Sequence, residues 1–140
     1  MFCFQCEQTA NCKGCTGNVG VCGKKADTAE LQDKLTGALI GLARATENNE
    51  HLLSDSTAAV VVESLFATLT NVNFDDERFY HLLERVDAEK RRLVPDCFVC
   101  TSQCGRNNEY DMNKLWNADE DIRSLKSLIL FGIRGVAAYA

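Results

Sequence analysis

Proline and long apolar runs are both scarce in this sequence. Pro95 is the single proline in 140 residues, so a long extended linker is not expected. No apolar run approaches the ~18 residues that a membrane-spanning helix needs, and the short run at 128–131 fits a buried helix better. The net charge of −5 argues against a nucleic-acid partner, because such proteins present a basic face. We therefore expect a globular chain with neither nucleic acid nor membrane as a partner.

Motifs that carry catalysis are also missing. The sequence contains no phosphate-binding loop, no nucleophile–histidine arrangement and no paired catalytic carboxylates. The two histidines, His51 and His81, are expected on the surface or on an exposed helix face rather than as ligands. The acids at 119–121 are best explained as the favourable first turn of a helix. We expect no catalytic residue within this chain.

Cysteine, by contrast, is abundant and concentrated at the front of the chain. Five of the eight cysteines lie in the first 22 residues, namely Cys3, Cys6, Cys12, Cys15 and Cys22. The same segment offers only four sizeable apolar groups, Phe2, Phe4, Val19 and Val21. Apolar packing therefore cannot offset the conformational entropy lost when this glycine-containing loop becomes ordered. We expect a group bonded to the sulfur atoms to hold it.

The redox compartment narrows what that group can be. No charged-then-apolar signal sequence precedes the cysteine motif, so we expect a cytoplasmic location. Thiols stay reduced there, and clustered cysteines then indicate metal or redox chemistry. Eight cysteines in 140 residues also fall short of a typical disulfide scaffold, and disulfides would conflict with the compartment.

Four cysteines form the spacing Cys3-x2-Cys6-x8-Cys15-x6-Cys22. If these four sulfur atoms hold an iron–sulfur cluster, the glycines between them allow backbone N–H groups to approach its inorganic sulfide. Such hydrogen bonds raise the reduction potential of a cluster. Lys24, Lys25 and the positive end of the helix that follows would favour the extra electron of a reduced cluster.

Spacing alone leaves another ligand set open. Cys12-x2-Cys15 pairs with Cys3-x2-Cys6 as a tetrathiolate site for zinc or a single iron. On that alternative the chain is a zinc-stabilised structural or interaction module without a redox role.

A second cysteine group follows Pro95, with the spacing Cys97-x2-Cys100-x3-Cys104. Three thiolates make an incomplete metal site, which Cys12, an exogenous ligand or a cysteine outside this chain would have to complete. Otherwise these are ordinary cysteines in a turn, with Cys97-x2-Cys100 as a candidate redox pair.

The remainder of the chain predicts an all-α fold. We expect residues 1–26 to form the cluster loop, 27–93 a three-helix bundle, 94–116 a connector, and 117–140 the first helix of a further bundle. The expected helix starts are Asp27 or Thr28 with Glu30, then Ser54, Asp75, and Asn117 or Asp119. The expected inward residues of the bundle are Leu31, Leu35, Ala38, Leu39, Leu42, Val60, Val61, Leu65, Phe66, Leu69, Phe79, Leu82, Leu83 and Val86.

Three further expectations concern packing. Gly37 and Gly41 leave a smooth face that another backbone can approach closely. Tyr110 and Trp116 are expected to anchor packing before the last helix. That helix is apolar nearly all round and runs to the final residue without a stop signal, so we expect it to be buried and the native polypeptide to continue.

The opening residues, Met1 to Ala10, with Gly14-Cys15 and Val21-Cys22-Gly23-Lys24, resemble the start of the hybrid-cluster proteins, a family also called prismane proteins or hydroxylamine reductases. Supporting matches are residues 28–33, 68–75 and 128–140. The resemblance implies that Cys3, Cys6, Cys15 and Cys22 hold an iron–sulfur cluster in a helical N-terminal domain. The x8 spacing matches the branch with a 4Fe–4S cubane, and a 2Fe–2S cluster is the alternative.

What the family does is implied in the same way. Electrons pass from this loop to a hybrid iron–sulfur–oxygen cluster, which reduces hydroxylamine to ammonia and water, with nitric oxide reduction also attributed to it. The ligands of that hybrid cluster lie in later domains that this chain lacks. The expected partners are therefore those remaining domains and an electron donor, either a redox protein or an NAD(P)H-dependent reductase.

Overall fold

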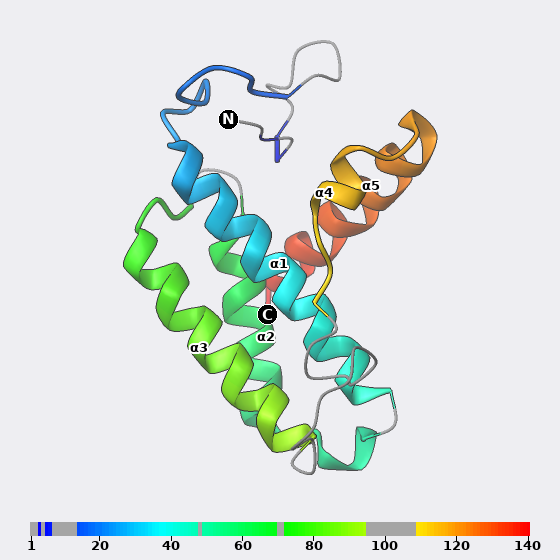
Figure 1. Ribbon diagram of the computed structural model, residues 1–140. Helices are drawn as coiled ribbons and strands as arrows, with labels where there is room; N and C mark the ends of the chain where they lie inside the picture. Colours follow the sequence, from blue (N-terminus) through cyan, green and yellow to red (C-terminus); the bar gives the residue numbers. More distant parts are fainter. Residues whose placement is uncertain (1–2, 4, 7–13, 48, 70–71, 95–108) are drawn as a thin grey trace.

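A computed structural model describes residues 3, 5–6, 14–47, 49–69, 72–94 and 109–140. Within these residues the chain forms five α-helices and one short 3-10 helix, and its only β-type pairings are two isolated bridges (Figure 1). The elements are α1 (Ala26–Thr46), η2 (Glu50–Leu52), α2 (Asp55–Ala67), α3 (Asp76–Leu93), α4 (Asn113–Trp116) and α5 (Glu120–Ala137). The predicted all-α fold is confirmed.

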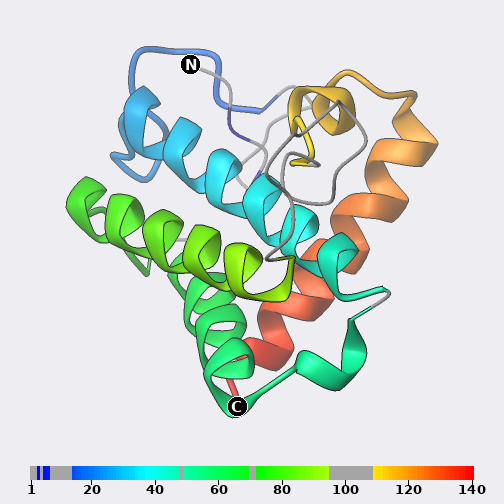
Figure 2. The same ribbon diagram turned by 60° about the horizontal axis from the view of Figure 1, so that its bottom comes forward.

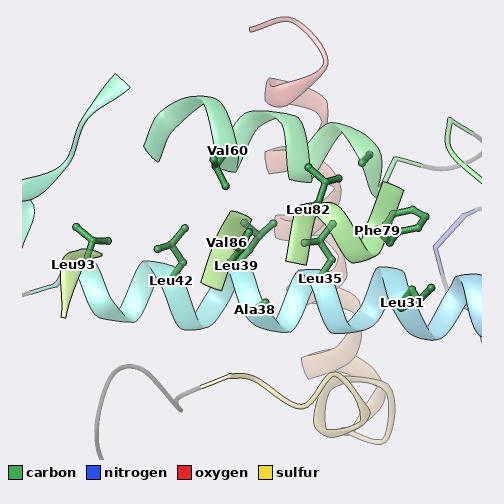
Figure 3. Close-up of a cluster of buried hydrophobic side chains, with 11 residues drawn as sticks. Leu31, Leu35, Ala38, Leu39, Leu42, Val60, Phe79, Leu82, Val86 and Leu93 are labelled. Atoms are coloured by element: carbon green, nitrogen blue, oxygen red, sulfur yellow. The ribbon is translucent and has the colours of Figure 1, made fainter. Parts of the chain in front are cut away.

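Helices α1, α2 and α3 share one apolar core, shown in Figure 3. Helices α1 and α3 run in the same direction, and at their starts the Thr28 hydroxyl donates to the Asp76 carboxylate at 2.6 Å. The buried members of the core are Leu31, Leu35, Ala38, Leu39, Leu42, Val60, Ala67, Phe79, Leu82, Val86 and Leu93. The predicted inward faces of α1 and α3 are therefore correct. The prediction that Phe66 on α2 faces the core is wrong, because this residue is 43% exposed.

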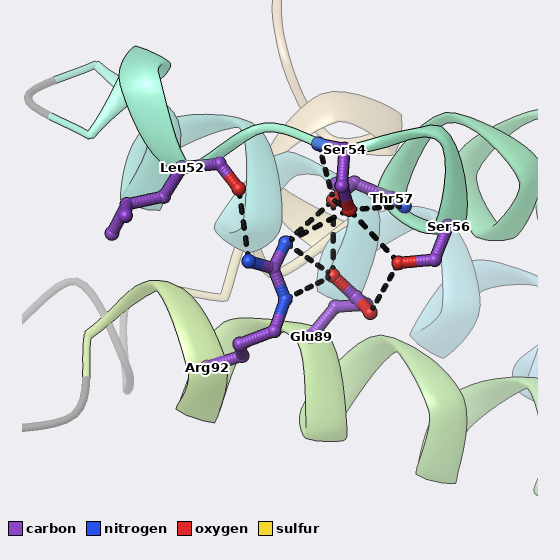
Figure 4. A network of polar contacts seen from close by, with 6 residues as sticks. All are labelled: Leu52, Ser54, Ser56, Thr57, Glu89 and Arg92. Carbon is purple, nitrogen blue, oxygen red and sulfur yellow. Dashed lines mark hydrogen bonds and ion pairs between the residues drawn. The ribbon is translucent and has the colours of Figure 1, made fainter.

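The start of α2 is fixed by side chains from α3, which runs antiparallel to it (Figure 4). Ser54 is the predicted N-cap and forms a capping box with Thr57. Arg92 donates to the Leu52 carbonyl at 2.9 Å and to the Thr57 hydroxyl at 2.8 Å. Glu89 accepts from Thr57 at 3.0 Å and from Arg92 at 2.9 Å. This network ties the end of α3 to the start of α2.

Of the other two capping residues, the one predicted for α3 is correct and the one predicted for α1 is wrong. Asp75 caps α3 by accepting from the Glu77 amide at 3.0 Å, as expected. The predicted cap of α1 at Asp27 or Thr28 is wrong, because α1 already begins at Ala26 and its cap residue Lys25 contributes no side-chain hydrogen bond. Thr28 is inside the helix, where its hydroxyl bonds α3 instead.

Gly37 is the point at which the chain before α4 meets α1. The Tyr110 amide donates to the Gly37 carbonyl at 3.2 Å, and a Cβ on Gly37 would overlap the Tyr110 carbonyl oxygen. Beyond this contact, a second small core forms from Met112, Leu115 and Trp116, with Ile40, Tyr110 and Leu130 packed against it. The predicted close approach at Gly37 and the anchoring roles of Tyr110 and Trp116 are confirmed.

Helix α5 begins after Asp119, one of the two predicted starts, and contacts α2 and α4. Figures 1 and 2 show it, in orange to red, crossing the bundle rather than lying along it. Most of its apolar residues are exposed, contrary to the expected burial. Those with exposed fractions of 45–71% are Ile122, Leu125, Leu128, Ile129, Ile133 and Val136.

Two further points concern organisation. In the part of the chain that the structure describes, no helix combines the length and apolar character needed to cross a membrane. The division of the chain at residues 26, 93 and 116 stays a prediction.

Candidate functional site

The cysteine loop lies at the N-terminal end of α1 (Figure 1). Cys3 is buried, Cys6 and Cys15 are half-buried, and Cys22 is exposed. None of these four forms a disulfide. The remaining predicted ligands, Cys12, Cys97, Cys100 and Cys104, lie outside the described residues.

Cys3 and Cys15 are brought together by the backbone. The Cys15 amide donates to the Cys3 carbonyl at 2.9 Å, and the two residues form an isolated antiparallel bridge. Gly14 makes this approach possible because its φ of 70° lies in the left-handed region that favours glycine. Among the described residues, no three Cys, His, Asp or Glu side chains gather as a metal site, so the pair is not extended to Cys6 and Cys22.

Cys22 lies in a tight turn that leads back to α1. The Gly23 amide donates to the Gly20 carbonyl at 2.9 Å, and Gly23 has a φ of 87°. The Gly20 amide donates to the Lys24 carbonyl at 2.8 Å. Val21, in the same turn, is 71% exposed, so apolar burial does not hold this part of the loop.

Lys24 is the main polar anchor of the loop. Its ammonium is buried and donates to Gln5 Oε1 at 2.9 Å and to Gln32 Oε1 at 2.6 Å. Gln5 stands between Cys3 and Cys6, whereas Gln32 belongs to α1. A single cation therefore joins both arms of the loop to the first helix. Lys25, for which the sequence predicts the same role as for Lys24, is exposed.

The pKa of the Cys3 thiol is raised, chiefly because burial disfavours the thiolate. The Asp33 carboxylate and Cys15 act in the same direction. A hydrogen bond from the Gln5 backbone and the positive charge of Lys24 oppose the rise in the pKa. An uncharged thiol is thus favoured at Cys3 until the thiolate gains a strong positive partner such as a metal ion.

Beneath the loop, Asp33 joins α1 to α4. Its carboxylate accepts from Trp116 Nε1 at 2.8 Å and, more weakly, from Gln5 Nε2 at 3.5 Å. Burial raises the pKa of Asp33 to about 6, although Trp116, Gln5, Arg134 and Lys24 all favour the carboxylate.

Arg134 brings α5 into the same polar layer. Its guanidinium is 2% exposed and donates to the Thr68 hydroxyl at 2.9 Å and to the Thr36 hydroxyl at 3.2 Å. Burial lowers the pKa of Arg134 to about 10, and the charges of Asp33 and Cys3 oppose that change. The side chain nonetheless stays charged near neutral pH.

Sequence reasoning missed this polar layer. Gln5, Gln32, Asp33 and Arg134 lie in segments that carry the family resemblance, but no role is predicted for any of them from the sequence. One signal was available: Thr28, Gln32 and Thr36 recur every four residues on α1, beside the apolar stripe, and all three are buried. Polar residues at that spacing on a buried face indicate a hydrogen-bonded interior.

The donor set suits a soft metal group with negative charge. Free thiolates are ligands for zinc and for iron–sulfur clusters, and the oxygen ligands preferred by magnesium or calcium do not gather here among the described residues. The buried ammonium of Lys24 would lie close to such a thiolate-bound group. In the described residues, the backbone positions two of the four predicted ligands, Cys3 and Cys15, side by side.

Comparison with known proteins gives matches over the whole chain. The Prismane/CO dehydrogenase family matches residues 1–140. Proteins named hydroxylamine reductase from Maridesulfovibrio salexigens and Methanocella arvoryzae are 39% and 40% identical, over 99% and 100% of this chain. A hydroxylamine reductase from Porphyromonas gingivalis is 40% identical over 100% of it.

The chain spans 28%, 30% and 28% of the length of these three relatives, respectively. No solved structure matches it significantly. The family match over the full length and the identities of 39–40% lead to one conclusion. The chain belongs to the Prismane/CO dehydrogenase family.

Proposed function

We propose that this chain is the electron-relay portion of a hydroxylamine-reductase-type oxidoreductase, with an iron–sulfur cluster held by residues 1–26. The observation that carries the proposal is the pairing of free Cys3 and Cys15 across a backbone bridge, with the buried Lys24 beside them. Burying a cation near paired thiols is costly, and the packing of the loop alone does not offset that cost. An anionic metal–thiolate group accounts for both the cation and the thiols.

Cys3, Cys6, Cys15 and Cys22 would hold the cluster, a 4Fe–4S cubane with 2Fe–2S as the alternative. When bound, the cluster supplies one-electron transfer. The protein's own part is to fix the ligands and exclude water. The bridge would fix Cys3 and Cys15, and the turn at 20–23 would present Cys22. Gln5, which stands between Cys3 and Cys6 in the sequence, is tied to Lys24 by a hydrogen bond.

In the longer protein, the electron would pass to a hybrid iron–sulfur–oxygen cluster, where hydroxylamine is reduced to ammonia and water. This chain corresponds to less than a third of the relatives' length, and we expect it to be catalytically inactive alone. The donor would be a redox protein or an NAD(P)H-dependent reductase, and the location cytoplasmic.

The remaining domains are the proposed partner of α5. Its exposed apolar face adjoins a groove of about 280 Å³ between α1 and α5, lined in part by Ile40, Leu130 and Ile133. Arg44 and Lys126 flank this groove, each within 6 Å of the centroid of the Tyr110 ring. Helices with an apolar stripe and an acidic edge would complement it.

Anaerobic purification and optical spectroscopy test the cluster proposal. We expect broad absorption at roughly 400 nm that a reductant bleaches, as iron–sulfur chemistry requires. Serine in place of Cys22 should abolish the absorption, whereas Cys12→Ser should leave it intact. Zinc held by Cys3, Cys6, Cys12 and Cys15 instead predicts a colourless protein whose zinc content falls in Cys12→Ser and is unchanged in the Cys22 variant. A colourless chain that contains zinc would refute the electron-relay function.

A further inference from the structure

Among the described residues, Lys24 is a buried cation that no carboxylate contacts. Its side chain is 2% exposed, and its two hydrogen bonds go to neutral amide oxygens, those of Gln5 and Gln32. The ion pairs found among the described residues, with N···O distances up to 4.0 Å, do not include Lys24. Buried charges are normally paired or bound to a metal group, because removing an ion from water is costly. The ammonium therefore requires a negative partner that the described side chains do not supply by contact.

The groups that can carry negative charge in this region are Asp33 and Cys3. Asp33 already accepts from Trp116 and Gln5, and the positive charges of Arg134 and Lys24 both favour its carboxylate. Cys3 is on the loop side, where Lys24 favours its thiolate. The Lys24 hydrogen bond holds the ammonium against Gln5, which stands between Cys3 and Cys6 in the sequence. The position left for its counter-charge is the thiolate group of the loop.

We propose that Lys24 supplies the fixed positive charge that raises the reduction potential of the metal–thiolate group, and that Lys25 does not. This inference rests on the proposed function. Reduction adds one negative charge, and a cation stabilises that charge strongly where burial limits screening by water. Lys25 is exposed, so solvent and salt weaken its effect. The sequence presents two adjacent lysines, and the fold gives them different roles.

Three substitutions separate this role from a purely mechanical one. Lys24→Gln removes the charge. Gln32→Glu keeps Lys24 and the oxygen atom at position 32 to which it donates, but that oxygen now belongs to a negatively charged carboxylate. Lys25→Gln is the matched control, one residue away on the surface. Each loaded variant is titrated with dithionite under anaerobic conditions, and the ratio of oxidised to reduced protein is followed optically.

At a fixed potential we expect Lys24→Gln and Gln32→Glu each to shift that ratio about tenfold toward the oxidised form, which is about 59 mV for a one-electron couple. Lys25→Gln should shift it less than twofold, and Lys24→Arg should restore most of the wild-type value. A purely mechanical tie predicts that a Lys24→Gln protein that retains its cluster keeps the wild-type ratio. If Lys24→Gln does not retain iron, Gln32→Glu is the remaining test, because it offsets the positive charge of Lys24 while the hydrogen bond is kept.

The failure of this inference can be told apart from failure of the proposed function. A wild-type chain without iron and acid-labile sulfide overturns both. A loaded wild type in which Lys24→Gln and Gln32→Glu match Lys25→Gln overturns the role of Lys24 alone. Loss of iron from both variants also overturns it, because a structural tie then explains the residue fully.

Discussion

Replacing Gly37 with alanine tests the packing that holds Trp116, and through it Asp33, beneath the cysteine loop. A Cβ at Gly37 overlaps the Tyr110 carbonyl oxygen, and backbone cannot move aside as a flexible side chain can. The same shift stretches the bond from the Tyr110 amide to the Gly37 carbonyl. Gly132 on α5 provides the matched control, because a Cβ there meets nothing within 4 Å.

The magnitude follows from three contributions to the free energy of unfolding. Overpacking costs about 1–3 kcal/mol, and loss of the hydrogen bond costs about 0.5–1.5 kcal/mol. Alanine in place of glycine within a helix returns about 1 kcal/mol. We therefore expect Gly37→Ala to destabilise the chain by about 1–3 kcal/mol, whereas Gly132→Ala stabilises it by up to about 1 kcal/mol.

Urea unfolding of the reduced, metal-free chain, followed by far-ultraviolet circular dichroism, measures this difference. With a slope of about 2 kcal/mol per molar urea, the midpoint for Gly37→Ala should fall by about 0.5–1.5 M. The midpoint for Gly132→Ala should stay level or rise. Equal stabilisation by the two alanines would refute the close contact at Gly37, and with it the placement of the 109–116 segment on α1.

Three further predictions concern the polar layer and the loop. The pKa of Asp33 is about 6 in the folded state against an ordinary 3.8, so between these values the folded state binds more protons than the unfolded state. The free energy of unfolding should therefore fall by about 2–2.5 kcal/mol as the pH rises from 4 to 7. Urea midpoints across this range should show that fall, Asp33→Asn should remove it, and Glu84→Gln, on an exposed site, should keep it. Arg134→Met leaves two buried threonine hydroxyls without the guanidinium that donates to them, so we expect the free energy of unfolding to fall by about 1–3 kcal/mol. Hydrogen exchange should accelerate in α5 before α3. Uniform acceleration would contradict this anchoring role. In the loaded chain, Cys6→Ala should remove exchange protection from residues 14–26 while the bundle stays cooperative, and unchanged protection there would count against a metal-held loop.

Local signals predicted those parts of the fold that depend on nearby residues. Asp75 and Ser54 are capping residues, and both caps form where the sequence places them. The inward stripe of α1 is correct because its apolar spacing alone determines which face is buried. His51 and His81 are exposed, as predicted from the sequence.

The errors arise where distant residues decide. Thr28 resembles a cap, but Asp76 lies 48 residues away in the sequence and takes its hydroxyl as a partner. Lys24 and Lys25 are chemically identical in the sequence, and only the positions of Gln5 and Gln32 bury the first of them. The four-residue spacing of Thr28 and Gln32 marks a buried polar face on α1, but it does not identify their distant partners.

The candidate site was predictable in kind and only partly in geometry. Cysteine spacing identifies candidate ligands, because two cysteines separated by two residues can bind from one turn. It does not show that Gly14 lets Cys15 pair with Cys3, nor that a buried ammonium lies beside them. The role of Cys12 and of the group at 97–104 stays a prediction.

Iron and acid-labile sulfide, measured together with zinc on anaerobically purified protein, test the central claim most directly. A loop too poor in apolar groups to order itself should contain iron and sulfide in equal numbers, about four of each per chain for a cubane or two for the smaller cluster. Zinc alone, or an ordered loop whose four thiols carry no metal, would contradict the account.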